Sequence, residues 1–390
     1  MWTKKATQLS VSELPQAHQN FMARNPGFTA HHQASTERVA NALRRYAASG
    51  KIEAENICKL VIKMTSSCNL RCEQCFQWRE TGFHHGLDPT AIPYEQSGHL
   101  FDFVERQRCD IILTGGEPTL HPDFPKFLSR LAEAGCFIYI CTNGLMIKRH
   151  FEELSKYHDQ LAFLISIDGP KDIHDSIRGK GTYNKTMAGI KLLADGKKAG
   201  KQWLIGVENT MMAKNLDRAT ELLNECEQAG VDWMIYNHLW VVDMMARSEY
   251  HRFCEDYDTV PNSYTGFDMG DFRPDYIEQV IDTIEKLRAY PAQIPVLFGP
   301  DYDADEIRQY YRGKMPARPH YLKMGVKLDV DIGGKLVMTK QFPDLVFGNV
   351  LETPIEELIA SEPYQRAAET MRQKSLKVLN ACPDAHNFLL

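Results

Sequence analysis

Short apolar runs alternate with longer amphipathic stretches along the middle of the chain, from about residue 58 to residue 240. Each run has the length of a buried strand, and the stretches between the runs place apolar residues three and four positions apart, as in helices packed on a core. Most runs follow one another at intervals of about 25–45 residues, which fits parallel strands joined by helices. The predicted strands are 60–64, 110–114, 137–141, 162–167, 203–209 and 233–238. This pattern predicts an α/β fold, a (βα)6 partial TIM-type barrel, whose functional residues follow the carboxyl ends of the strands.

The chain on either side of the predicted barrel, 56–240, has different patterns. Residues 1–55 are polar with helical spacing and predict an N-terminal helical extension. The segment 241–320 is rich in aromatic, Asp and Pro residues, and we expect an irregular connecting segment there. For 321–390 we expect a small α+β C-terminal domain, a hairpin followed by a final helix. The expected hairpin strands and helix are 326–330, 335–339 and 354–374.

The composition is that of a folded globular protein. Of the 390 residues, 43% are hydrophobic and 25% are charged, which excludes wholesale disorder and a collagen-like chain. The net charge of −6 provides no overall attraction to nucleic acid or to anionic membranes. The N-terminal residues lack the apolar core of a signal peptide, and no apolar run reaches the roughly 18 residues of a membrane span. We therefore expect a soluble, cytoplasmic protein with neither nucleic acid nor membrane as a partner.

Three of the ten cysteines stand close together. Cys68, Cys72 and Cys75 form C-x3-C-x2-C directly after the first predicted strand, and their soft thiolates can converge on one metal centre. A closed zinc site takes four ligands, and no second cysteine pair is present. A four-iron cluster held by three thiolates leaves one iron open for another ligand. A non-catalytic zinc-binding module remains an alternative, and the other cysteines are better explained as buried apolar side chains.

Short motifs follow the predicted strands in a fixed order. They are Cys68-Asn-Leu-Arg-Cys72-Glu-Gln-Cys75, Gly115-Gly116-Glu117-Pro118, Thr142-Asn143-Gly144, Ser166-Ile167-Asp168-Gly169-Pro170, Ile177-Arg178-Gly179 and Val207-Glu208-Asn209-Thr210. Any one of these motifs alone, the glycine pair especially, is unspecific. In this order, each at or after a strand, the motifs resemble those of the radical S-adenosylmethionine (SAM) superfamily, over roughly residues 55–240.

The resemblance implies a radical SAM enzyme with one [4Fe-4S] cluster, held by the three cysteines, and with SAM bound to the open iron. In such enzymes, an electron from a flavodoxin- or ferredoxin-type donor splits SAM into methionine and a 5′-deoxyadenosyl radical, which abstracts a hydrogen atom from the substrate. The residues implied as cofactor contacts are Gly115, Gly116, Glu117, Pro118, Asn143, Ser166, Asp168, Arg178 and Asn209.

The implied roles agree with the chemistry of each group. The paired glycines let the backbone approach the ligand closely, and Glu117 accepts a hydrogen bond from the SAM ammonium. By the resemblance, Ser166 and Asp168 lie near the ribose, and Arg178 pairs with the SAM carboxylate. One position departs from the family pattern: many members carry an aromatic residue directly before the third cysteine, where this chain has Gln74.

The C-terminal part resembles the SPASM/twitch extension of many such enzymes, which normally binds one or two auxiliary clusters through several cysteines. The resemblance is carried by 325–339, Phe347-Gly348-Asn349-Val350 and Pro354-Ile-Glu-Glu-Leu358. Here Leu322 and Thr339 stand at expected cysteine positions, and beyond residue 260 only Cys382 remains. We therefore expect a domain without a cluster that closes the barrel mouth and shapes the substrate pocket. A single cluster favours redox-neutral reactions: epimerisation, rearrangement, elimination or adenosylation.

Cys254 is the candidate hydrogen-atom donor, because some radical epimerases use a thiol in this role; a buried structural cysteine is the simpler interpretation. Tyr236, Tyr302 and Tyr310 are the alternatives. The expected substrate is a small molecule, such as a sugar, a nucleoside or another metabolite, and the enzyme an isomerase, a lyase or an oxidoreductase. Two other hypotheses stay open: maturation of a peptide, since this extension is common among peptide-maturing members, and a scaffold that binds SAM without cleaving it.

Overall fold

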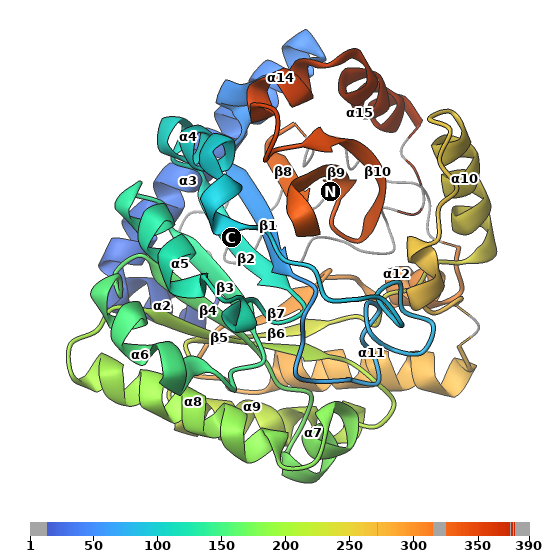
Figure 1. Ribbon diagram of the computed structural model, residues 1–390. Helices are drawn as coiled ribbons and strands as arrows, with labels where there is room; N and C mark the ends of the chain where they lie inside the picture. Colours follow the sequence, from blue (N-terminus) through green and yellow to red (C-terminus); the bar gives the residue numbers. More distant parts are fainter. Residues whose placement is uncertain (1–13, 271, 315–324, 375, 377, 379–390) are drawn as a thin grey trace.

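Ten strands form a single sheet in the computed structural model, which describes residues 14–270, 272–314, 325–374, 376 and 378. The strand order is β10-β9-β8-β1-β2-β3-β4-β5-β6-β7, and β1 to β7 run parallel (Figure 1). The parallel strands are β1 (Lys59–Thr65), β2 (Asp110–Gly115), β3 (Ile138–Thr142), β4 (Leu161–Ser166), β5 (Leu204–Thr210), β6 (Trp233–Asn237) and β7 (Val296–Gly299). The predicted partial barrel is confirmed, with one parallel strand more than expected.

Among its described residues, the segment 241–320, expected to be irregular, contains this additional strand and three α-helices. β7 has only four residues and lies between Pro295 and Pro300. The sequence therefore has no long apolar run at this strand that would predict it. The buried residues of α11 recur three and four positions apart from Ile277 to Leu287, a pattern that indicates a helix. The three helices are α10 (Met244–Glu255), α11 (Pro274–Ala289) and α12 (Ala304–Tyr311).

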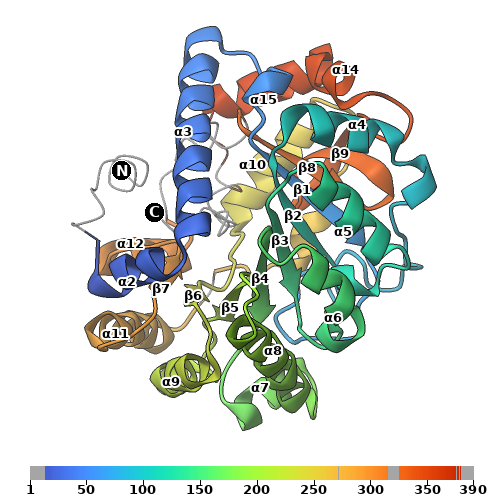
Figure 2. The same cartoon turned by 90° about the vertical axis from the view of Figure 1, so that its left-hand side faces the viewer.

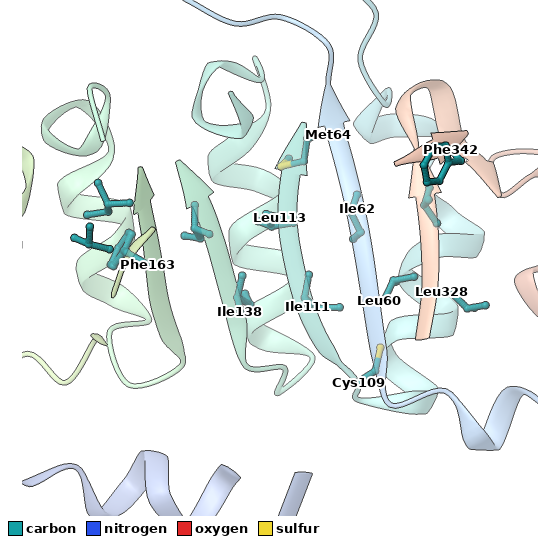
Figure 3. Packing of buried hydrophobic residues seen from close by; sticks show 14 of the residues in the cluster. Leu60, Ile62, Met64, Cys109, Ile111, Leu113, Ile138, Phe163, Leu328 and Phe342 are labelled. Carbon is teal, nitrogen blue, oxygen red and sulfur yellow. The ribbon is translucent and has the colours of Figure 1, made fainter. Parts of the chain in front are cut away.

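Helices between the strands cover the outer face of the sheet (Figure 1). They include α4 (Gly98–Gln107), α5 (Phe124–Glu133), α6 (Ile147–Lys156), α7 (Lys171–Arg178), α8 (Thr182–Lys198) and α9 (Ala219–Ala229). The main core lies between these helices and the strands. Figure 3 shows Leu60 and Ile62 of β1 beside Ile111 and Leu113 of β2, all of them fully buried. None of the described helices is both long and apolar enough to cross a membrane.

The N-terminal helices α2 (Gln16–Arg24) and α3 (Pro26–Ser49) cover the other face of the sheet. Figure 2 shows them on the opposite side of the strands from α4, α5 and α6. Phe21, Met22 and Phe28 pack there against a second apolar cluster from the strands, made of Phe137, Ala162, Leu164, Leu204, Trp233 and Ile235. These helices therefore fill the amino end of the barrel, and the site has to lie at the carboxyl ends of the strands.

The C-terminal hairpin extends the barrel sheet. β8 (Lys327–Asp331) pairs in parallel with β1, with Leu328 opposite Leu60, and continues into the antiparallel strands β9 (Lys335–Thr339) and β10 (Phe342–Asn349). The predicted helix 354–374 is divided at Ser361 into α14 (Ile355–Ala360) and α15 (Glu362–Lys374). Leu322 and Cys382, which the sequence analysis singled out, lie outside the described residues.

A buried ion pair joins the barrel to this hairpin. The Nζ of Lys63 on β1 lies 2.5 Å from the Oδ1 of Asp331 at the end of β8, and both side chains are more than nine-tenths buried. The Lys63 ammonium also lies over the Phe83 ring. Because a buried charge is costly unless it is paired, each of the two residues requires the other.

Candidate active site

A cavity of about 260 Å³ lies at the carboxyl ends of the barrel strands. Its wall includes most of the residues that the sequence singled out: Cys68, Cys72, Cys75, Gly115, Gly116, Glu117, Asn143, Ser166 and Arg178. The others do not line it: Pro118, Asp168, Asn209 and Cys254. Motifs that are far apart in the sequence thus meet at one place, because the carboxyl ends of parallel strands share one end of the barrel.

The three cysteines lie on the loop after β1. Burial raises the pKa of Cys68 to about 12 and that of Cys72 to about 11, so at neutral pH these groups are thiols until a positively charged metal centre binds them. The described residues hold no three His, Cys, Asp or Glu side chains placed to share one metal ion. In a four-iron cluster, by contrast, each thiolate binds a different iron. The donor set therefore fits an iron–sulfur cluster.

The glycine pair lets the loop after β2 pack directly on the start of the cysteine loop. A Cβ on Gly115 would lie 2.3 Å from the carbonyl oxygen of Thr65, and a Cβ on Gly116 would lie 2.3 Å from that of Ser67 and 2.4 Å from that of Ser66. The Gly116 amide also donates to the Thr65 carbonyl at 2.7 Å. Glycine is required here because two protein loops approach each other closely. The sequence had predicted a close approach of the backbone to the ligand instead.

Glu117 connects the same loop to β3 and is 1% exposed. Its Oε1 accepts hydrogen bonds from the amide and hydroxyl of Thr119 and from the Thr142 hydroxyl, and its Oε2 accepts from the Asn143 amide. Burial raises the pKa of Glu117, and these donors counteract the rise. The Asn143 side chain in turn donates to Asn69 in the cysteine loop at 2.8 Å. Four donors bind its oxygens, so Glu117 holds the loops together. The expected hydrogen bond from the SAM ammonium stays a prediction, since Glu117 also lines the cavity.

Asp168 was expected near the ribose, but its carboxylate is fully buried behind the wall and holds Arg178. Its Oδ2 accepts from the Nε of Arg178 at 2.6 Å and from the side-chain amide of Gln74, and its Oδ1 accepts from the Thr210 amide at 3.0 Å. Gln74, the residue that departs from the family pattern, therefore supports this carboxylate. Ser166 and Arg178 remain on the wall of the cavity.

On β5 the cavity is lined by Glu208, a residue that the sequence did not single out. Alternate side chains of a strand point to opposite faces, so Glu208 and Thr210 line the cavity and Asn209 does not. The Asn209 amide is buried and donates to the Ile167 carbonyl at 3.1 Å. Pro118 likewise is buried, in the short turn η4 (Pro118–Leu120) after β2. Its place near the carboxyl end of a predicted strand marks Glu208 as a candidate, but Asn209 shares this signal.

Further wall residues come from the end of β6, from the chain around residue 267 and from the turn between β9 and β10. They are Asn237, His238, Trp240, Phe267, Lys340 and Gln341. Burial lowers the pKa of His238 to about 3, so its imidazole is neutral. The rings of Phe76 and Phe267 stack at 4.9 Å and give this part of the wall an aromatic character. The expected role of the C-terminal hairpin in shaping the pocket rests on Lys340 and Gln341.

Glu208 makes the stability of the fold depend on pH. Burial raises the pKa of Glu208 from 4.5 to about 6, against the opposing charges of Lys340 and Arg178. Between these two pH values the folded protein retains a proton that the unfolded chain releases, so the free energy of unfolding falls as the pH rises from 4.5 to 6. The free energy of unfolding of Glu208→Gln should therefore rise relative to that of the wild type. The difference between the two proteins should be about 1–2 kcal/mol more favourable to the variant at pH 7.5 than at pH 4. Denaturant unfolding at both pH values measures this gain.

The exposed Glu80 provides the control for this prediction. Glu80→Gln makes the same chemical change at an exposed position and should change the free energy of unfolding little. A stability difference for Glu208→Gln that is the same at pH 4 and pH 7.5 would show that the buried carboxyl does not titrate in this range.

Cys254 does not reach the cavity. It is fully buried on α10, beside the Tyr250 hydroxyl, and burial raises its pKa to about 12. This position does not support the expected role as hydrogen-atom donor. Among the tyrosine alternatives, Tyr236 is buried and donates to the Ala219 carbonyl. Tyr302 and Tyr310 pack against His238, one residue layer behind the wall.

Comparisons with known proteins agree with this site. Residues 62–207, which run from β1 to β5, match the Radical SAM superfamily. The chain is 29% identical over 170 residues to Fe-coproporphyrin III synthase of Methanosarcina barkeri, an alignment that covers 43% of this chain and 41% of that relative. It thus spans less than half of that relative's length. Over 339 residues it is 24% identical to pre-heme d1 synthase of Dinoroseobacter shibae, covering 82% of this chain and 77% of the relative.

The fold is shared with SuiB of Streptococcus suis. The structure of SuiB bound to S-adenosylmethionine covers 84% of this chain, and 72% of SuiB is covered in return, with a TM-score of 0.59 and 17% sequence identity. A second structure shows SuiB bound to its precursor peptide SuiA, with a TM-score of 0.57. At this identity the likeness concerns the fold: a parallel barrel followed by an antiparallel hairpin. Over residues 62–207, which carry most of the cavity wall, the chain is similar to the radical SAM superfamily of enzymes.

Proposed function

We propose that the protein uses SAM to abstract a hydrogen atom from a small molecule held in the cavity. The observation that carries this proposal is the convergence of the cysteine loop, the glycine loop after β2, Ser166 and Arg178 on one cavity. When bound, the [4Fe-4S] cluster and SAM supply the 5′-deoxyadenosyl radical that performs the abstraction. A flavodoxin- or ferredoxin-type protein is the proposed electron donor.

The residues of the chain have two kinds of role toward these cofactors. The three cysteines would hold the cluster, and Ser166 and Arg178 offer donors to the polar groups of SAM. Glu117, Asn143 and Asp168 support them, because their hydrogen bonds fix the loops and the arginine. We therefore retain Ser166 and Arg178 as contacts of SAM and assign a positioning role to Glu117 and Asp168.

The remaining polar residues of the wall are proposed to face the substrate. Glu208, Asn237 and His238 come from β5 and β6, and Lys340 and Gln341 come from the β9–β10 turn. One oxygen of Glu208 and the side-chain oxygen of Asn237 are buried without a hydrogen-bond partner among the described residues, so donors on a substrate would satisfy them. A hydroxyl- or amine-bearing metabolite, such as a sugar or a nucleoside, has such donors.

Any substrate has to share the cavity with the proposed cluster and SAM, so the wall has to open when these groups bind. A volume of about 260 Å³ lies below the about 300–1,000 Å³ of typical ligand pockets. The names of the two curated relatives make a tetrapyrrole the first larger substrate to test, and the SuiB–SuiA complex makes a precursor peptide the second. Either would require the wall to open further than a sugar or a nucleoside does.

We propose a single cluster and a redox-neutral reaction. After Cys254 the sequence contains only Cys382, and one thiolate does not hold a cluster. Thr339, where the extension of related enzymes carries a cysteine, lies next to Lys340 and Gln341 of the cavity wall. The C-terminal hairpin would thus contribute to substrate binding in place of an auxiliary cluster. Epimerisation, rearrangement, elimination and adenosylation are the reactions that fit.

Iron and sulfide analysis tests the proposal directly. Protein reconstituted without oxygen should bind about four irons and four sulfides per chain, and with dithionite it should release 5′-deoxyadenosine from SAM. Cys68→Ala should lose both properties, because the loop then offers two thiolates. About eight irons would contradict the single cluster, and stoichiometric zinc in place of iron would contradict the enzyme altogether.

Cys254→Ala is the matched control for this experiment, since it removes a buried cysteine that does not line the cavity. It should keep its iron and its SAM cleavage. A metabolite extract can then be added to the wild type: stimulation of 5′-deoxyadenosine release that survives protease treatment indicates a small molecule. Stimulation that protease destroys indicates the peptide alternative.

A further inference from the structure

Arg178 contacts two groups of very different chemistry. At the end of α7, its Nε donates to Asp168 at 2.6 Å, and its Nη1 lies 3.8 Å from the Sγ of Cys72. The Arg178 side chain is only 12% exposed, and the Asp168 carboxylate is fully buried. Because a guanidinium is rigid and planar, the hydrogen bond at Nε also determines where Nη1 lies. The contact with the Cys72 sulfur is therefore built into the protein.

Asp168 is itself held from two directions. The Thr210 amide at the end of β5 donates to its Oδ1, and the Gln74 side chain donates to its Oδ2. Gln74 belongs to the cysteine loop, two residues after Cys72. A chain of contacts thus leaves the cysteine loop at Gln74, passes through Asp168 and Arg178, and returns to the loop at the Cys72 sulfur.

We propose that Arg178 tunes the electron affinity of the cluster through the sulfur of Cys72, and that Asp168 and Gln74 are positioning residues for it. This rests on the proposed function, because it takes Cys72 as a ligand of the cluster. The role differs from binding the SAM carboxylate, since it acts in the protein before SAM is added. It also gives a reason for Gln74, whose side-chain amide donates to the Asp168 carboxylate at a position where related enzymes often carry an aromatic residue.

The direction of the effect follows from electrostatics. Reduction adds negative charge to the cluster and its sulfur ligands. Hydrogen bonds to these sulfurs and a nearby positive charge stabilise the reduced state, so they raise the reduction potential. Asp168 has the opposite charge, but it binds the guanidinium at Nε, whereas Nη1 is the group that lies 3.8 Å from the Cys72 sulfur. The net effect of the Arg178–Asp168 pair is thus to make the cluster easier to reduce.

The test is a redox titration of the reconstituted protein without SAM, followed by the electron paramagnetic resonance signal of the reduced cluster. Arg178→Gln removes the charge and the rigid donor, and should shift the midpoint potential to a more negative value. Arg178→Lys keeps the charge without the planar fork and should shift it less. Gln74→Leu should also shift it negatively, because Asp168 then holds the arginine less firmly.

Lys214→Gln is the matched control. Lys214 follows β5, is half exposed and pairs with Glu73 of the cysteine loop. This change therefore removes a positive charge beside the same loop without touching a cysteine sulfur. Its midpoint potential should equal that of the wild type, because exposed charges are screened.

The outcomes separate this inference from the proposed function. Equal potentials for the wild type and Arg178→Gln would overturn the inference, as would an equal shift in Lys214→Gln. A wild type that assembles no cluster would instead contradict the proposed function. Should Arg178→Gln fail to assemble a cluster, the potentials of Arg178→Lys and Gln74→Leu decide: a negative shift in both supports the inference, and no shift in either overturns it.

Discussion

Replacing Gly116 with alanine should remove most of the iron from the reconstituted protein and abolish the release of 5′-deoxyadenosine. The new Cβ would overlap the carbonyl oxygens of Ser66 and Ser67 at 2.4 and 2.3 Å. These atoms belong to the backbone, which cannot move aside like the end of a flexible side chain. The start of the cysteine loop would be displaced from the end of β2, and Cys68 follows directly. Iron and sulfide per chain measure the effect, with circular dichroism to monitor the fold.

Gly98→Ala provides the comparison. Gly98 is the first residue of α4, it is exposed, and an added Cβ there meets nothing within 4 Å. This variant should bind as much iron as the wild type and cleave SAM at the same rate. Full iron content and normal cleavage in Gly116→Ala would show that the contact between the two loops is dispensable.

Lys63→Met should destabilise the fold by about 3–5 kcal/mol. The change leaves the carboxylate of Asp331 buried without its partner, 2.5 Å from the place of the lost ammonium. A buried charge that loses its counterion retains its full desolvation cost, which is far larger than the loss of an exposed ion pair. Denaturant unfolding at neutral pH measures the change in the free energy of unfolding.

The double variant Lys63→Met/Asp331→Leu isolates this effect. Replacing both charges with apolar residues removes the unpaired carboxylate, so the double variant should be more stable than Lys63→Met alone. A double variant as unstable as the sum of the two single variants would indicate that packing, rather than charge, determines the loss. The exposed pair Lys191–Asp195 on α8 serves as the reference, since Lys191→Met should cost less than about 1 kcal/mol.

Much of the site could be predicted because its signals are local. Each motif directly follows, or ends, an apolar run that reads as a strand, and parallel strands bring their carboxyl ends together. Cys68, Gly116, Ser166 and Arg178 are therefore found together on the cavity wall, although more than 100 residues separate the first from the last. Six of the strands β1 to β7 could be predicted for the same reason, because each is a longer apolar run than β7.

The rest depends on contacts that no short stretch of sequence contains. Strands buried on both faces show no alternation of apolar and polar residues. Only the orientation of β5 in the sheet decides that Glu208, and not Asn209, faces the cavity. The burial of Asp168 behind Arg178 depends on Gln74, which is distant in sequence. The pairing of β8 with β1 is equally remote and makes the C-terminal hairpin part of the barrel sheet.

This pairing has a consequence for the synthesis of the protein. β1 is complete only when β8, which ends at Asp331, has left the ribosome. At about 5–20 residues per second, one edge of β1 stays open for roughly 13–50 s. An open apolar edge invites association with other nascent chains, and a charge placed on it discourages this. Lys63 lies next to this edge, and before it meets Asp331 we expect its charge to discourage such association.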